Sequence, residues 1–294
     1  MVSLLPGPWE PDLHDGMTYA QFVASTHRRV SGLRLDSGET VIDDLAVEEP
    51  LEIRIGDGRT VLRSVVTMRT PGADLELAAG WLRGEGIVHS SDDLLAVRAC
   101  TDPSLLPEAR GNVVTADLAA PALPRLATLG RATDITGACG VCGTESLEQV
   151  VSRVAEPLTV TGSVMTRNTA LALTEALRNA QRVFARTGGL HGAAVADADG
   201  RLLAVREDIG RHNAVDKVTG WALMNEATPA ALVVSSRASF EIVQKAAASH
   251  IPIVVTVSAP STLAVDLAER TGITLAAFAR EGRATVYTHE QRLN

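Results

Sequence analysis

Two cysteines separated by two residues are the most chemically suggestive feature of this sequence. Cys139 and Cys142 lie in the segment Thr136–Gly143 (TGACGVCG), and each is followed by glycine. The chain has only three cysteines in 294 residues, so this spacing indicates a purpose other than packing. Glycines beside a thiol leave the backbone free to bend and keep the sulfur accessible. The segment is therefore predicted to be a loop that presents sulfur to another molecule.

Three kinds of chemistry use such a pair of cysteines. The pair could form half of a structural zinc site, act as a redox couple, or carry sulfur as a persulfide. Cys100 and a histidine could complete a zinc site, so a zinc-stabilised binding module without catalysis is a real alternative. Spacing alone favours zinc over redox chemistry, and redox chemistry over sulfur carriage. Cys100 by itself is more simply a buried small apolar residue.

The composition excludes several classes of protein. The chain is 46% hydrophobic and 21% charged, which is typical of a globular protein, and its net charge is −8. An acidic chain is a poor candidate for general binding to nucleic acid or to a membrane surface. Met1–Arg29 lacks the basic start and apolar run of a secretory signal, and no apolar stretch approaches ~18 residues. We expect a cytoplasmic protein with reduced thiols.

The pattern of apolar residues predicts an α/β (α+β) fold. The first half alternates at Leu51–Ile55 and again at Arg63–Met68, as strands do, with a helix after Asp74 as its cap. The second half begins with a long helix to Gly188 and a hairpin around Asp199–Gly200. Helices and short apolar strands then alternate, which favours a mixed sheet with helices on both faces.

The sequence pattern predicts four regions in the chain. Residues 1–40 form a partly disordered N-terminal extension that could include one early strand, and residues 41–135 form a small β-rich domain. Residues 136–160 hold the cysteine loop and a short helix, and residues 161–294 form the larger domain.

Several ordered segments together resemble one family. The segments are Thr67–Gly72, Cys139–Gly143, Arg186–His191, Arg206–Lys217, Phe240–Ala246, Ser258–Pro260 and Gly282–Thr288. A lone C-x-x-C pair would be a weak signal, but the ordered set is specific. On these segments the sequence is similar to the FdhD family of formate dehydrogenase accessory sulfurtransferases, over roughly Asp43 to Leu293.

The resemblance implies a function and a set of partners. Members of this family accept persulfide sulfur from a cysteine desulfurase and pass it to the molybdenum or tungsten bis-molybdopterin guanine dinucleotide cofactor. Formate dehydrogenase then receives the sulfurated cofactor. The resemblance also implies a homodimer and a core of cytidine-deaminase type in residues 161–294.

The zinc chemistry of the deaminases is not expected here. A zinc deaminase needs H-x-E on one helix and P-C-x-x-C on the next. Asn213 and Ala214 follow His212, and the helix after Ser235–Ser236 has no cysteine. The sequence therefore predicts a shared fold without the deaminase metal.

The resemblance also implies roles for individual residues. Cys139 matches the cysteine that carries the persulfide, and Cys142 could assist by attacking or guarding it. A second segment matches the family's cofactor-binding stretch and follows a predicted core strand, although alone it would be read as a solvated basic turn. Its residues are Phe278, Ala279, Arg280, Glu281, Gly282 and Arg283. Arginines suit the phosphates of a dinucleotide, and Gly282 would let the backbone approach.

Four further polar residues lie in the matching segments near the ends of predicted elements. They could line the cofactor cavity, but a histidine in such a place is more often a hydrogen-bonded structural residue. These residues are His191, Asp208, Arg211 and His212.

Overall fold

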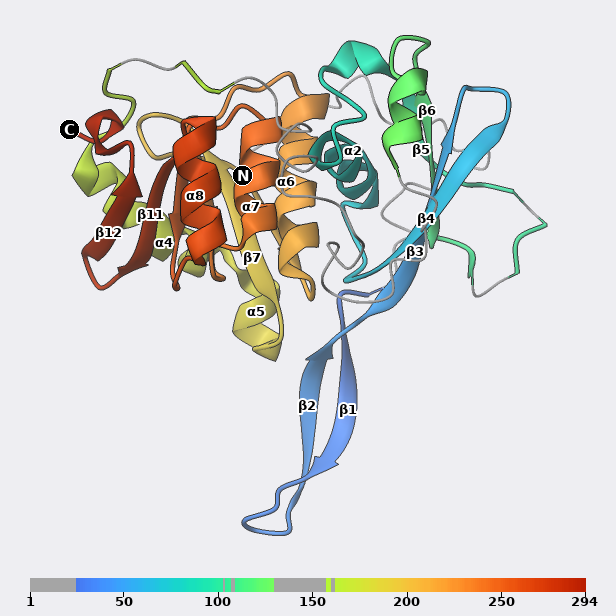
Figure 1. The fold of residues 1–294 in the computed structure, drawn as a ribbon. Coiled ribbons are helices and arrows are strands. Elements are labelled where there is room, and N and C mark those ends of the chain that lie inside the picture. The colour runs from blue at the N-terminus through green and yellow to red at the C-terminus, as the bar shows by residue number, and fades with distance from the viewer. Residues whose placement is uncertain (1–24, 103, 107–108, 130–156, 160–161) are drawn as a thin grey trace.

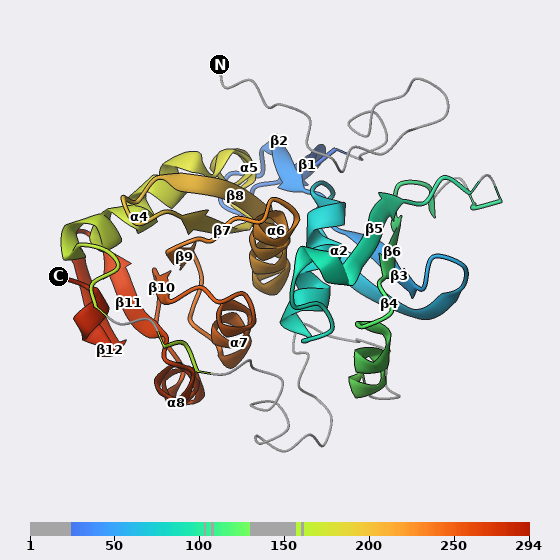
Figure 2. The ribbon, with the colours of Figure 1, turned by 90° about the horizontal axis from the view of Figure 1, so that it is seen from above.

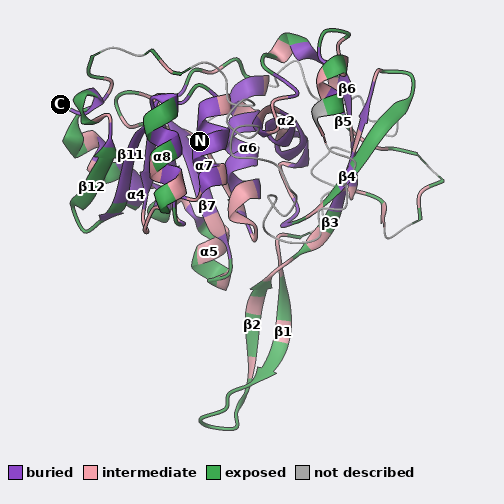
Figure 3. Ribbon diagram, in the orientation of Figure 1, coloured by how far each residue is buried: buried purple, intermediate pink, exposed green. Residues whose placement is uncertain are grey.

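Three sheets organise the computed structural model, which describes residues 25–102, 104–106, 109–129, 157–159 and 162–294 (Figure 1). The smallest is an antiparallel ribbon of two strands that extends away from the rest of the molecule. Figure 3 shows that this ribbon is exposed along most of its length. Its strands are β1 (His27–Leu33) and β2 (Thr40–Ala46).

The largest sheet has six strands in the order β12-β11-β10-β9-β7-β8. Its three central strands are parallel, and the outer strands on each side run antiparallel to their neighbours. The strands β9 and β10 are short and wholly buried, as expected for apolar strands covered on both faces, while β11 is exposed toward its end. The strands are β7 (His191–Ala196), β8 (Leu202–Asp208), β9 (Ala231–Val234), β10 (Ile253–Thr256), β11 (Thr274–Arg280) and β12 (Arg283–Thr288).

Helices cover both faces of the six-stranded sheet, as the sequence predicted. One apolar core lies between the sheet and α4, and another lies between the sheet and α6, α7 and α8. The structure thus confirms the mixed α/β class, while the closer likeness to deaminases stays a prediction. The helices are α4 (Arg167–Ala180), α5 (Arg182–Thr187), α6 (Arg211–Met224), α7 (Phe240–Ala248) and α8 (Thr262–Thr271).

A four-stranded sheet in the order β4-β3-β6-β5 lies beside the larger sheet. Its strands alternate buried and exposed residues, and the buried face packs against α2. Its elements are β3 (Glu49–Gly56), β4 (Val61–Arg69), α2 (Asp74–Gly84), β5 (Leu94–Ala99) and β6 (Val113–Leu118). Short 3-10 helices are Ser91–Asp93, Leu123–Thr128 and Glu290–Arg292.

The two larger sheets are joined where α2 crosses α6. Figures 1 and 2 both show these helices side by side between the sheets. Gly80 and Gly220 lie at the crossing, and neither has room for a side chain. A Cβ at Gly80 would overlap the carbonyl oxygen of Asp216 and lie 2.6 Å from its carbon. A Cβ at Gly220 would similarly lie 2.7 Å from the carbonyl carbon of Glu76.

The early strand that the sequence allows in residues 1–40 corresponds to β1, which pairs with β2. Two other expectations about the elements need correction. The long helix expected up to Gly188 is broken at Gln181, whose ψ of 83° is not helical and whose buried side chain lies against Gly192. Asp74 does not cap α2, because it is the first residue of that helix and its carboxylate binds Arg69.

No helix among the described residues combines the length and apolar character needed to cross a bilayer.

We predict that Gly80→Ala or Gly220→Ala destabilises the protein by at least about 3 kcal/mol, although alanine favours helix formation. The added methyl group must displace the backbone of the opposing helix. Gly32→Ala is the matched control, because no heavy atom lies within 4 Å of a Cβ at Gly32. Urea unfolding of the three variants checks this; equal stability of all three would contradict such close packing.

Candidate cofactor pocket

A pocket of about 640 Å³ lies between the first turn of α4 and the β11–β12 hairpin. The helix contributes Arg167, Ala170 and Leu171, which share one face because they are three and four residues apart. The hairpin contributes a mixture of apolar, hydroxyl and guanidinium groups. These residues are Ala276, Phe278, Arg280, Gly282, Arg283, Ala284, Thr285 and Val286. The volume lies within the range of small-molecule sites, ~300–1,000 Å³.

The backbone of the hairpin is irregular beside the pocket. Phe278 and Glu281 have φ values of 54° and 53°, which are uncommon for residues other than glycine. The pairing of β11 with β12 also shifts between Ala277 and Arg280. A bulge of this kind redirects side chains, and the Phe278 side chain remains 40% exposed at the pocket. Local strain of this type is often kept at binding sites.

Guanidinium groups dominate the charge of the pocket. Arg167, Arg280 and Arg283 line it, and among the residues that the structure describes no acidic side chain does. Arg283 also pairs with Glu281 at the turn, with 3.0 Å between nitrogen and oxygen, but both side chains are mostly exposed. An exposed pair of this kind is weak, so Arg283 remains available to an anion. The pocket therefore suits a ligand that carries both phosphates and a flat apolar group.

The structure brings most of the predicted cofactor-binding segment to this pocket. Phe278, Arg280, Gly282 and Arg283 line it. Ala279 does not line it, because its side chain is fully buried and packs in the core with α4. The Glu281 carboxylate lies at the turn and binds Arg283. Cys139 and Cys142, for which sulfur carriage was predicted, lie outside the described residues.

His212 and Glu241 form a pair at the first turns of α6 and α7. The His212 Nε2 and the Glu241 Oε2 are 2.5 Å apart, and the Ser239 hydroxyl lies 3.3 Å from the same nitrogen. His191 begins β7 nearby, and its pKa is lowered by burial and by the charges of Arg211 and His212. The four residues that could line a cofactor cavity do not line the described pocket: His191, Asp208, Arg211 and His212. Their part in cofactor binding stays a prediction.

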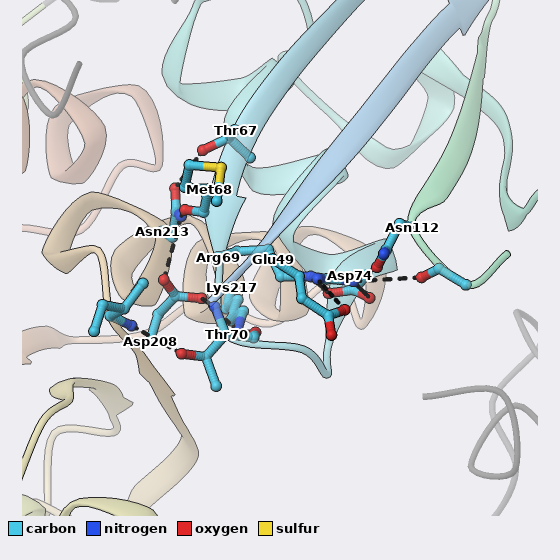
Figure 4. A network of polar contacts seen from close by, with 12 residues as sticks. Glu49, Thr67, Met68, Arg69, Thr70, Asp74, Asn112, Asp208, Asn213 and Lys217 are labelled. Carbon is cyan, nitrogen blue, oxygen red and sulfur yellow. Dashed lines mark hydrogen bonds and ion pairs between the residues drawn. The ribbon is translucent and has the colours of Figure 1, made fainter. Parts of the chain in front are cut away.

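Asp208 joins the two larger sheets through a buried network (Figure 4). The Lys217 ammonium lies 2.7 Å from the Asp208 carboxylate and donates to the Thr70 carbonyl at 2.8 Å. The backbone N–H of Thr70 donates back to Asp208, and the Asn213 amide donates to Asp208 and to the Met68 carbonyl. Burial raises the pKa of Asp208, and Lys217 opposes that effect. The network holds the end of β4 against α6.

Arg69 and Asp74 continue the network on the side of the smaller sheet (Figure 4). The Arg69 guanidinium donates two bonds of 3.0 Å to Asp74 and one of 2.8 Å to Asn112. Both charged side chains are buried, and Glu49 lies 3.6 Å from the remaining nitrogen. These contacts give the Thr67–Gly72 segment a structural role, because they hold the turn between β4 and α2 in place.

Another buried ion pair joins α6 to α7. The Lys245 ammonium donates to the Asp216 carboxylate at 2.6 Å, and both side chains are buried. Burial raises the pKa of Asp216 to about 6, while the charge of Lys245 acts in the opposite direction. Burial lowers the pKa of Lys245, but the negative charges of Asp216 and Glu85 outweigh this effect, so the pKa is raised.

No group of three or more His, Cys, Asp or Glu side chains within the described part of the chain is arranged to hold a metal ion. Cys100 is a free, half-buried thiol. The alternative of a zinc-stabilised module stays a prediction, because it depends on Cys139 and Cys142.

Sequence reasoning did not identify Arg167 or Leu171 as pocket residues. Both lie more than a hundred positions before the hairpin, and neither belongs to a segment that resembles the family. Their spacing indicates one face of an amphipathic helix, but it does not indicate a binding site. Their place beside the hairpin depends on how α4 packs across the sheet.

We predict that Lys245→Met destabilises the protein by about 3–5 kcal/mol, because Asp216 keeps its buried carboxylate without a partner. Removing Lys245 raises the pKa of Asp216 further above its unfolded value. The variant therefore loses stability as the pH rises from the pKa of Asp216 in the unfolded chain through its pKa in the folded chain. Its loss of stability relative to the wild type is larger near pH 8 than near about pH 5. Urea unfolding at both pH values measures this.

The double variant Asp216→Asn/Lys245→Met is the matched control for that prediction. It removes both charges, so its stability should depend less on pH than that of Lys245→Met. The same loss for Lys245→Met at both pH values would contradict a buried, partnerless carboxylate.

Comparison with known proteins gives a consistent result. Residues 46–294 match the model of the FdhD/NarQ family. The sulfur carrier protein FdhD of Mycobacterium tuberculosis is 48% identical over 281 residues, covering 92% of this chain and 99% of that protein. The protein of the same name from Nocardia farcinica is 47% identical, covering 85% of this chain and 88% of that protein.

A solved structure shares the fold. It is the crystal structure of a protein from Desulfotalea psychrophila provisionally described as a formate dehydrogenase accessory protein. It superposes with a TM-score of 0.68 at 22% identity and covers 93% of this chain and all of that one. The family match spans both larger sheets, the α2–α6 crossing and the pocket. This chain therefore belongs to the FdhD/NarQ family.

Proposed function

We propose that this chain is a sulfur carrier that serves the maturation of formate dehydrogenase. The observation that carries the proposal is the 48% identity, over 92% of the chain, to relatives described as sulfur carrier protein FdhD. The glycine-flanked C-x-x-C segment supports it, because a carrier thiol must be accessible to both donor and acceptor.

Sulfur enters as a persulfide on Cys139. The Cys139 thiolate attacks the terminal sulfur of a persulfide on a cysteine desulfurase. A new sulfur–sulfur bond forms on Cys139, the bond in the donor breaks, and the donor cysteine leaves as a thiolate. The exchange is neutral in electrons, so it needs no oxidant or reductant.

Cys142 offers a route for release. Its thiolate attacks the inner sulfur of the Cys139 persulfide and expels the terminal sulfur as sulfide, which leaves a Cys139–Cys142 disulfide. The two cysteine sulfurs supply the two electrons that the departing sulfur gains. A dithiol reductant then restores both thiols, which fits a cytoplasmic protein.

The pocket beside the β11–β12 hairpin is the proposed site for the nucleotide part of the acceptor. The substrate class is the molybdenum or tungsten bis-molybdopterin guanine dinucleotide cofactor, which carries nucleoside diphosphate groups. Phe278 and Val286 offer apolar surface to a base, while Arg280 and Arg283 offer guanidinium groups to phosphates. The local positive charge works against a net charge of −8 for the whole chain. A homodimer would present two such pockets, which matches the two dinucleotides of the cofactor.

We predict that Cys139→Ala abolishes persulfide formation and the activation of formate dehydrogenase but leaves the fold intact. The measurement is intact-mass spectrometry after incubation with a cysteine desulfurase and cysteine. The wild-type protein should gain the mass of one sulfur atom, which a reductant removes.

Cys100→Ala is the control for that experiment, because Cys100 is a thiol that lies away from the pair in the sequence. It should gain sulfur as the wild type does. Sulfur loading of Cys139→Ala, or active formate dehydrogenase in cells that hold only this variant, would contradict the proposal. Stoichiometric zinc whose removal unfolds the protein would favour the binding module instead.

We predict that Phe278→Ala weakens the binding of both GDP and guanosine by about tenfold, because the base loses its stacking surface. Arg280→Ala should weaken GDP binding to a similar degree but leave guanosine binding nearly unchanged. Calorimetric titration of the two ligands separates these effects. A Phe278→Ala variant that binds GDP as the wild type does would refute the proposed place of the base.

A further inference from the structure

Arg167 lies on the helix wall of the pocket, across from the arginines of the hairpin. It is the first residue of α4 and lines the pocket with Ala170 and Leu171. Its Nε donates to the Leu293 carbonyl at 3.4 Å. At this length the contact is weak, and it involves only Nε; no other hydrogen bond joins the Arg167 side chain to the residues that the structure describes. The two terminal nitrogens are the ones that can donate together to a phosphate.

The end of α4 adds to the positive character of this wall. The first turn of the helix contains no acidic residue, and Thr166 caps it by accepting from the Thr169 N–H. The helix has 14 residues, so its N-terminus carries an appreciable partial positive charge. Arg167 therefore extends from a positive helix end into a pocket that already contains two arginines.

We propose that Arg167 binds the diphosphate of the nucleotide together with Arg280 and Arg283. This inference rests on the proposed function, because it assigns a residue to the same pocket. The arginines of the hairpin hold the ligand from one side, and Arg167 holds it from the helix. The diphosphate is then bound between α4 and the β11–β12 hairpin, which lie far apart in the sequence.

The test is calorimetric titration of the full-length chain with GDP and with guanosine. We expect Arg167→Ala to weaken GDP binding by about tenfold or more, which is the loss of one charge-assisted phosphate contact. Guanosine binding should be unchanged, because guanosine has no phosphates. Arg167→Lys should lose an intermediate amount, since it keeps the charge but not the planar fork.

Arg182→Ala is the matched control, because Arg182 is an exposed arginine of α5 that does not line the pocket. It should bind GDP as the wild type does. Thermal unfolding of each variant shows that the fold is retained, as expected for an exposed position such as Arg167.

Two results would overturn the inference. The first is an Arg167→Ala variant that binds GDP as tightly as the wild type while Arg280→Ala is weakened, which leaves the proposed function standing. The second is an equal loss of GDP and guanosine binding in Arg167→Ala, which would show a structural role. If the wild-type chain does not bind GDP at all, the assignment of the pocket to a nucleotide and this inference are both wrong.

Discussion

The close crossing of α2 and α6 is the contact on which the arrangement of the two larger sheets depends. Gly80 and Gly220 let the two backbones touch, and this brings Asp208 and Lys217 within reach of the turn at Thr70. Buried charges are tolerated here because each has an opposite charge and further hydrogen bonds. Without the glycines, the helices could not approach closely enough for those bonds to form. The two glycines and the buried hydrogen-bonded ion pair thus hold the two sheets together.

The pocket depends on different features of the same fold. The parallel strands β9, β10 and β11 are buried by helices on both faces, which leaves their carboxyl ends as the place where side chains can meet a ligand. The bulge in β11 and the left-handed backbone at Phe278 and Glu281 then bring an aromatic ring and arginines to that edge. The strained backbone at these two residues lowers the stability locally, and the packing of the sheet beneath it offsets this loss.

The second half of the chain could be predicted closely from its sequence. Its short apolar strands alternate with helices that cover both faces of a mixed sheet, as the apolar pattern predicts. The break at Gln181 could not be predicted, since it depends on a side chain buried against a strand that follows later in the sequence. The ribbon that β1 forms with β2 was not predicted either, although one early strand was allowed. Its apolar residues, such as Leu33 and Ile42, are exposed, so no alternation marks a buried face.

The candidate site was predicted in part. The segment from Phe278 to Arg283 drew attention through its resemblance and its arginines, yet nothing local indicated that Ala279 would be buried away from the pocket. Arg167 had no signal at all, because its role depends on the packing of α4 over the sheet. Binding sites built from distant elements are the part of a fold that local patterns describe least well.

The proposed binding of a nucleoside diphosphate between α4 and the β11–β12 hairpin can be measured by hydrogen–deuterium exchange of the full chain with and without GDP. With GDP bound, we expect slower exchange in residues 166–171 and 276–288 and no change at the α2–α6 crossing. Protection elsewhere with none at the hairpin, or no protection at saturating GDP, would contradict a nucleotide site at this hairpin.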